Sequence, residues 1–181
     1  KFRMLAYSDL NIKIRNKRYI PSPFIIAKIL EEIKFKGSEM ILLIGSNVGY
    51  EATIISKLGD TVIAIEEDIE MKKLADKNIK DFNIENIVLI NNKHHLGHKK
   101  LGPYDAIISL DPLLTLSNDL LSQLAEGGKL LYFERQDVNL NETKLSIFHN
   151  IKNKFIKQQL FDLNLPCPIN TKIHNSKFNF S

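Results

Sequence analysis

A glycine-containing turn between an apolar run and a helix constrains the fold of this chain more than any other feature. Residues 41–44 are apolar, Gly45 and Gly49 bracket the turn Gly-Ser-Asn-Val-Gly, and a second apolar run ends at the acid Glu66. Glycine lets the backbone approach a ligand closely, and an acid at the tip of the next strand can accept hydrogen bonds from both hydroxyls of a ribose. The pattern predicts an open α/β sheet with a pocket for an adenosine-bearing cofactor.

The spacing within the turn narrows the choice of cofactor. The turn lacks the G-x-G-x-x-G spacing of a pyrophosphate-binding loop and so favours a smaller adenosine ligand, S-adenosylmethionine. Asn47 stands where a middle glycine could be, and asparagine tolerates a left-handed backbone. We expect Gly45, Ser46, Asn47 and Gly49 to line the cofactor site, with Glu66 on the ribose. The alternative is a strand-turn-helix unit without a ligand, which many α/β proteins contain.

Composition places the chain among ordinary globular proteins. Its 181 residues suit one domain, and 44% hydrophobic with 25% charged residues is typical of a soluble protein. No apolar run approaches the roughly 20 residues that cross a bilayer, and no signal peptide is visible. The only cysteine, Cys167, excludes an internal disulfide and favours the cytoplasm. The net charge of +4 comes from scattered lysines, so a nucleic-acid partner is not favoured.

Apolar strands alternate with amphipathic helices from about residue 24 to residue 135, which predicts a mostly parallel sheet with helices on both faces. We expect helices over 23–33, 50–58, 68–81 and 117–124, and strands over 40–44, 61–66, 87–90, 104–110 and 129–134. Glycines should punctuate them: Lys36-Gly37 ends the first helix, Gly59 the second, and Glu126-Gly127-Gly128 forms a turn. Strands over 143–149 and 154–163, joined by a turn at 150–153, should form an antiparallel hairpin that closes the seven-stranded sheet.

Several motifs occur in one order along nearly the whole chain. They are Ala6-Tyr7-Ser8-Asp9, Tyr19-Ile20-Pro21-Ser22-Pro23-Phe24, the turn over 43–50, Glu66, the strand Tyr104-Asp105-Ala106-Ile107-Ile108, and the segment 121–130. In this order the chain resembles the protein-L-isoaspartate O-methyltransferases, which are repair enzymes that depend on S-adenosylmethionine. The resemblance implies a Rossmann-like methyltransferase fold and methyl transfer to the carboxylate of L-isoaspartyl residues in damaged, flexible polypeptides. It also implies three segments: a loop or lid over 1–22, a methyltransferase-like domain over 23–168, and a loosely ordered tail over 169–181.

The sequence departs from the family pattern at both ends of the implied site. Pro21 occupies the position of the family serine between cofactor and substrate, and Ser22 follows it, so Ser22 is the candidate catalytic hydroxyl. Tyr7, Ile20, Pro21 and Ser22 form the implied substrate side. Asn92 and Lys93 match the adenine-binding positions, but lysine only donates hydrogen bonds and cannot accept one from the adenine amino group.

Two other functions compete with protein repair. A methyltransferase-fold protein with weakened or lost cofactor binding, serving a binding or structural role, is favoured by Leu43, Asn47 and Lys93. A nucleic-acid methyltransferase is favoured by the positive charge and by Asp111-Pro112, although this pair lacks the aromatic residue that stacks on a flipped base and otherwise reads as a turn that opens a helix. His94, His95 and His98 resemble a metal-ligand set, but Gly97 interrupts the helical spacing, so we expect solvated histidines and no metal.

Overall fold

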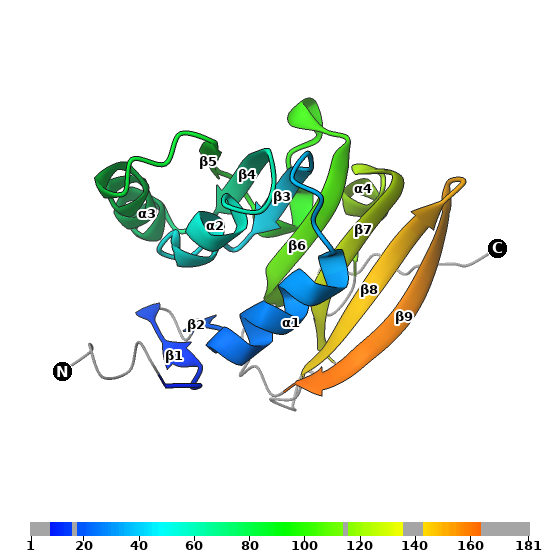
Figure 1. Ribbon diagram of the computed structural model, residues 1–181, viewed down its shortest axis with the longest axis horizontal. Helices are drawn as coiled ribbons and strands as arrows, with labels where there is room; N and C mark the ends of the chain where they lie inside the picture. Colours follow the sequence, from blue (N-terminus) through cyan, green and yellow to red (C-terminus); the bar gives the residue numbers. More distant parts are fainter. Residues whose placement is uncertain (1–7, 16–17, 114–115, 136–142, 164–181) are drawn as a thin grey trace.

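One sheet of seven strands organises the chain (Figure 1). The computed structural model describes residues 8–15, 18–113, 116–135 and 143–163. The strands are β3 (Met40–Ile44), β4 (Thr61–Glu66), β5 (Ile87–Asn91), β6 (Tyr104–Leu113), β7 (Leu124–Arg135), β8 (Thr143–Ile151) and β9 (Lys154–Leu163). Their order is β5-β4-β3-β6-β7-β8-β9. Neighbours from β5 to β7 run parallel, and β8 and β9 add an antiparallel edge, which confirms the predicted sheet.

Helices cover both faces of the central strands, which is why these strands are apolar along their whole length. On one face, α1 (Pro23–Ile33) and α2 (Tyr50–Ile55) pack their isoleucines against Ile41 and Leu43 of β3. On the opposite face, the short helix α4 (Asn118–Leu121) packs Leu120 and Leu121 in the cluster that contains Leu42. Helix α3 (Ile69–Asp81) follows β4 and lies beside α2 (Figure 1). The result is the three-layer arrangement of an α/β protein.

Helix α1 has the expected bounds but ends for a different reason. Ser22 caps its first turn, with its hydroxyl accepting from the Ile25 N–H, and Pro23 suits the first helical position. The predicted stop at Gly37 is wrong: the chain leaves the helix at Lys34, whose φ of 58° is left-handed. The Lys129 ammonium donates to the carbonyls of Glu32 and Ile33 at 2.9 and 3.0 Å. A lysine from β7 therefore satisfies the helix end.

Two predicted helices are longer in the sequence pattern than in the structure. Helix α2 ends at Ile55, and Gly59 does not have the positive φ of a left-handed helix cap. A Cβ on Gly59 would lie 2.3 Å from the Ile41 Cδ1, so close packing explains the glycine. Helix α4 ends at Leu121, because Leu124 already belongs to β7 and pairs with Tyr104.

The predicted turn at 126–128 lies inside a strand. β7 runs from Leu124 to Arg135, and its register with β6 jumps from Tyr104–Leu124 to Ala106–Lys129. The extra residues form an irregularity in the strand, and Gly127 has the positive φ of 75° that such a bend tolerates. Residues 126–128, predicted to form a turn between two elements, therefore form a bulge within one strand.

The C-terminal hairpin has the predicted antiparallel pairing. β8 continues to Ile151 and β9 begins at Lys154, so the connection is shorter than the expected four residues. Lys152 and Asn153 both have positive φ, at 52° and 61°. Two successive left-handed residues make the turn whose twist matches the flanking strands.

The N-terminal segment contains more regular structure than the predicted loop or lid. Strands β1 (Ile12–Lys13) and β2 (Tyr19–Ile20) pair antiparallel in a separate two-stranded ribbon. Figure 1 shows this ribbon beside the start of α1. The predicted tail over 169–181 lies outside the described residues. No helix in the described part of the chain is long and apolar enough to cross a membrane.

Candidate cofactor site

The candidate site lies where the parallel strands end. Gly45 follows β3, Glu66 ends β4, Asn92 follows β5, and Asp111 lies near the end of β6. Carboxyl ends of parallel strands share one edge of the sheet, and ligands of open α/β sheets bind there. The sequence-predicted turn and acid are therefore brought together as expected.

Internal hydrogen bonds fix the glycine turn to β4. The backbone N–H groups of Gly45 and Ser46 donate to the Ile65 carbonyl at 3.0 and 3.1 Å, and that of Gly49 donates to the Ser46 carbonyl at 2.8 Å. Gly45, Asn47 and Gly49 all have positive φ, of 78°, 51° and 87°. Asn47 does adopt the left-handed backbone that its side chain tolerates. These hydrogen bonds and backbone angles hold the turn against β4.

The Glu66 carboxylate is fully buried and accepts hydrogen bonds from four donors. Its Oε1 accepts from Arg18 Nη1 at 2.5 Å and the Asp68 N–H at 2.9 Å. Its Oε2 accepts from Arg18 Nη2 at 2.9 Å and the Asn47 N–H at 2.8 Å. A carboxylate offers about four lone-pair positions. The hydrogen-bonding capacity that a ribose would use is taken up within the protein.

Arg18 reaches this site from the N-terminal ribbon. Its side chain is only 13% exposed and makes a two-pronged ion pair with Glu66. Burial alone would lower the pKa of Arg18, but the hydrogen bond and the negative charge of Glu66 raise it above its ordinary value. A Cβ on Gly45 would lie 3.4 Å from Arg18 Nη2. The guanidinium therefore lies against the glycine turn as well as against the acid.

A second buried pair adjoins the first. His94 Nδ1 lies 2.8 Å from Asp111 Oδ2, and His94 Nε2 lies 3.8 Å from Glu66 Oε1. The Glu67 N–H lies 3.3 Å from Nε2, and Nδ1 is the ring nitrogen that faces Asp111. Burial raises the pKa of Asp111, but the hydrogen bond and charge of His94 and the charge of Arg18 outweigh it, so the net shift is downward. Asp111 is thereby held ionised beside the turn.

Among the residues that the structure describes, three buried polar atoms of the turn and α2 find no hydrogen-bond partner: Ser46 Oγ, Asn47 Oδ1 and Glu51 Oε2. Burial raises the pKa of Glu51 to about 7, against the opposing effects of backbone and Asn47 hydrogen bonds and the Arg18 charge. Buried polar groups are normally paired, and an unpaired one costs about 1–3 kcal/mol. Such atoms fit a polar ligand that contacts this turn.

At the adenine-side loop, the expectation that the histidines are solvated is wrong for His94, which is buried. Asn92 donates to the Gly97 carbonyl at 2.9 Å, and Lys93 is exposed. The next residue, His94, is 4% exposed and contacts the Glu66 region. The buried group at this loop is thus a histidine, with Lys93 outside it.

The substrate-side residues lie where the ribbon joins α1. Tyr7 is outside the described residues, and Ile20 belongs to β2. Pro21 and Ser22 are buried, and the Ser22 hydroxyl accepts from the Ile25 N–H as a helix cap. The Ser22 N–H donates to Asn11 Oδ1 at 2.9 Å. The Ser22 hydroxyl, which the sequence suggested as the catalytic group, therefore caps helix α1.

The histidine segment forms two short 3-10 turns, η3 (His94–Leu96) and η4 (Lys99–Leu101). His94 lies in the first turn and His98 precedes the second, so they do not share one helix face. In the described ranges, no group of three or more His, Cys, Asp or Glu side chains is placed to hold a metal ion. His94 contacts carboxylates instead.

The Asp111-Pro112 pair does not open a helix as the plain interpretation predicted. β6 extends to Leu113, so both residues belong to a strand. The Asp111 carbonyl accepts from the Ser109 hydroxyl at 3.0 Å, and its carboxylate faces His94. Pairing with β7 through Leu113 and Glu134 continues the strand past the proline.

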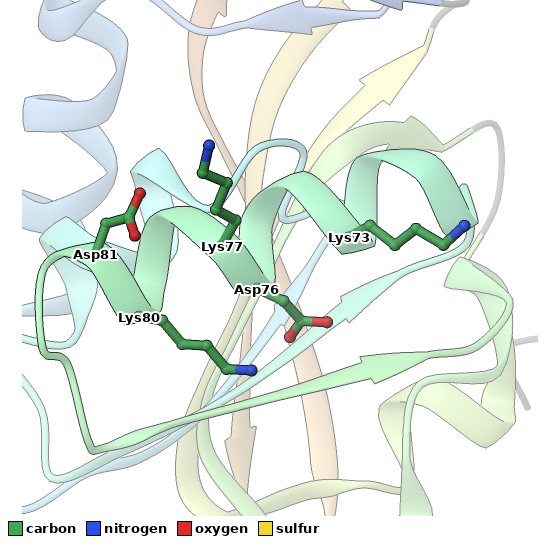
Figure 2. Close-up of a pocket in the computed structure, with 5 residues that line it drawn as sticks. All are labelled: Lys73, Asp76, Lys77, Lys80 and Asp81. Carbon is green, nitrogen blue, oxygen red and sulfur yellow. The ribbon is translucent and has the colours of Figure 1, made fainter.

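A depression lies on the outer surface of α3, away from the candidate site, and is lined by Lys73, Asp76, Lys77, Lys80 and Asp81 (Figure 2). Figure 2 shows these side chains fanning out from one helix in different directions. Lys72 pairs with Asp76 at 2.6 Å, and Glu70 pairs with Lys73 at 2.9 Å. This surface is a solvated helix face without convergent groups.

The sequence analysis missed two site residues, Arg18 and Glu51, and it considered His94 only as a metal ligand or a solvated side chain. Glu51 follows the glycine turn directly, so a carboxylate in the first turn of a buried helix was an available signal. Arg18 offered no local pattern, and the histidine cluster suggested a metal partner for His94 and not a carboxylate. Their partners Glu66 and Asp111 lie far away in the sequence.

The site geometry can be set beside known proteins. A protein-L-isoaspartate O-methyltransferase of Syntrophobacter fumaroxidans is 32% identical over 126 residues, covering 70% of this chain and 59% of that protein. A protein-L-isoaspartate O-methyltransferase structure from Plasmodium falciparum, in complex with S-adenosyl-L-homocysteine, matches with a TM-score of 0.71 and 26% identity, covering 89% of this chain and 80% of that one. Another structure of this enzyme matches with a TM-score of 0.80 at 19% identity, covering 92% and 54%.

The chain spans about three-fifths of the length of the first curated relatives that it matches, with 59% and 58% for two of them. The family described as Protein-L-isoaspartate(D-aspartate) O-methyltransferase (PCMT) matches residues 1–160. The α/β fold, the glycine turn and the acid at the end of β4 agree with that match. The chain belongs to the protein-L-isoaspartate O-methyltransferase family.

Proposed function

We propose that the protein transfers a methyl group from S-adenosylmethionine to the side-chain carboxylate of L-isoaspartyl residues in damaged, flexible polypeptides. The family match and the relative in complex with S-adenosyl-L-homocysteine support this proposal over nucleic-acid methylation. The single observation in this chain that carries it is the glycine turn with unpartnered buried Ser46, Asn47 and Glu51 atoms beside Glu66. We expect it to act in the cytoplasm.

The residues present fit the cofactor. Glu66 would accept from the ribose hydroxyls in place of Arg18, and the turn from Gly45 to Gly49 would lie against the rest of the ligand. The unpartnered Ser46, Asn47 and Glu51 oxygens would gain hydrogen bonds from its polar groups. When bound, the cofactor supplies a methyl group on a positively charged sulfur.

The proposed reaction needs little acid-base chemistry from the protein. An isoaspartyl carboxylate has a pKa near 4 and is ionised at pH 7, so no general base has to activate it. The protein has to align the carboxylate with the methyl group and exclude water, which are effects of proximity and orientation. Ser22, buried at the start of α1, and Ile20 in the ribbon would position the substrate. Pro21 at the family serine position removes a hydroxyl without removing a proton-transfer step.

A binding and transfer assay tests the proposal. S-adenosyl-L-homocysteine is titrated calorimetrically, and labelled methyl transfer is measured to an L-isoaspartyl peptide and to its aspartyl counterpart. We expect binding and transfer to the isoaspartyl peptide only. Glu66→Gln should weaken binding by about 1.5–3 kcal/mol, because a charged acceptor is lost, and Glu85→Gln on the exposed surface should not. Equal methylation of both peptides, or binding without any transfer, contradicts the proposed substrate.

A further inference from the structure

We propose that Arg18 is a latch on the ribose subsite, so that an adenosine ligand binds only after the N-terminal ribbon releases Glu66. The inference rests on the proposed function, because it assumes that the ribose goes to Glu66. Arg18 competes with the cofactor for the carboxylate of Glu66.

Competition follows from the hydrogen bonds of Glu66. Arg18 holds one acceptor position on each carboxylate oxygen, and the backbone N–H groups of Asn47 and Asp68 hold the others. The two backbone donors belong to the loops that follow β3 and β4 and are part of the fold. Arg18 is the donor that can leave, since it comes from a separate ribbon. Ribose hydroxyls and the guanidinium cannot use the same two positions at once.

The position of Arg18 adds a steric argument. Its Nη2 atom lies 3.4 Å from where a Cβ on Gly45 would be. This glycine is the point at which the backbone can approach a ligand closely. The guanidinium therefore occupies the space over the turn that an adenosine ligand would enter.

The ribbon that carries Arg18 can open without breaking the seven-stranded sheet, although opening releases the partly buried Tyr19 from the core cluster that contains Ile25. Each of its strands has two residues, and such short pairs have little stability of their own. Its attachments include the Ser22 N–H to Asn11 Oδ1 and the Phe24 N–H to Asp9 Oδ1, both close to α1. Opening the ribbon leaves the seven-stranded sheet intact, which makes a local transition the expected route.

The unpartnered atoms of the turn and α2 point to the same conclusion. Within the described ranges, Ser46 Oγ, Asn47 Oδ1 and Glu51 Oε2 are buried without hydrogen bonds. Buried polar atoms without partners disfavour the closed state. A ligand that replaces Arg18 can provide the partners that the closed state lacks.

The test compares three variants with the wild type. Arg18→Gln removes the latch, Arg18→Lys keeps the charge without the two-pronged geometry, and Arg15→Gln changes an exposed arginine of the same segment. S-adenosyl-L-homocysteine is titrated calorimetrically into each protein, and backbone hydrogen exchange is measured without ligand. We expect Arg18→Gln to bind about tenfold more tightly, with faster exchange over residues 18–22, because a larger share of molecules is open. Arg18→Lys should fall between, and Arg15→Gln should match the wild type.

The outcomes separate the latch from the function. If Arg18→Gln binds no more tightly than wild type while wild type binds, or if exchange over residues 18–22 is unchanged, the latch is overturned and the proposed function stands. If none of the four proteins binds the ligand, both proposals are overturned. Tighter binding and faster exchange in Arg18→Gln, with Arg18→Lys between it and the wild type and Arg15→Gln unchanged, support the latch.

Discussion

Glu51 gives the most direct test of the site electrostatics, because its carboxyl group is fully buried beside the glycine turn. Its pKa rises from an ordinary 4.5 to about 7, chiefly through burial. The folded protein thus holds the Glu51 proton more tightly than the unfolded chain does. The contribution of Glu51 to the free energy of unfolding is fully present below pH 4.5 and is lost as the pH rises to about 7.

The magnitude follows from the size of the shift. Each pKa unit corresponds to about 1.4 kcal/mol, so a rise from 4.5 to about 7 is worth about 3 kcal/mol of unfolding free energy. Glu51→Gln keeps the shape of the side chain and cannot ionise. The variant should therefore gain about 2.5 kcal/mol relative to wild type between pH 5 and pH 8, because a smaller part of the loss already occurs below pH 5.

Urea unfolding followed by circular dichroism measures this difference, since the chain has no tryptophan for fluorescence. Wild type and Glu51→Gln are compared at pH 5, 6, 7 and 8, with Glu85→Gln at the exposed surface as the control. A stability difference between wild type and Glu51→Gln that stays constant over this range would refute the reasoning. It would mean that Glu51 is ionised throughout or that water reaches it.

Two further predictions concern the backbone of the fold. Gly45→Ala should lower the free energy of unfolding by about 1–3 kcal/mol, because its φ is 78° and the new Cβ meets the Asp111 N at 3.3 Å. Gly37→Ala should lower the free energy of unfolding by less, because Gly37 has a φ of 93° but open space around it. Equal losses in the two variants would contradict the role of the contact between the new Cβ at residue 45 and Asp111. Lys129→Met should cost about 1–2 kcal/mol, because two carbonyls at the end of α1 lose their donor. Lys154→Met on the exposed hairpin is the control for Lys129→Met. If urea unfolding shows that the two variants are equally stable, the capping role of Lys129 is contradicted.

The sheet was predictable because its strands are short apolar runs separated by turn residues. Residues 41–44 are fully buried on both faces, and a strand in that environment carries no polar residues to obscure it. Elements without such a pattern were missed. The two-residue strands β1 and β2 are too short to show any period, and the bulge at Gly127 resembles a turn in sequence.

The sequence predicted only those site residues that belong to a recognisable short motif. The turn from Gly45 to Gly49 has a fixed spacing, and Glu66 follows an apolar strand. Arg18 and His94 acquire their roles from partners that only the folded sheet brings near, Glu66 and Asp111. A charged residue in an N-terminal segment is usually solvated, so sequence reasoning had no ground to choose Arg18 over its neighbours.

The strand order has a consequence for the path by which this chain folds. β3 is the first strand of the main sheet along the chain, yet it lies in the middle, where Ile41 pairs with both Val62 and Ala106. Its pairing with β6 requires closing a long loop, which is entropically costly and slows folding. The β8–β9 hairpin closes through Lys152 and Asn153 alone and needs no distant partner. During synthesis, the centre of the sheet therefore waits for β6, and the strands made last can pair soonest after they appear.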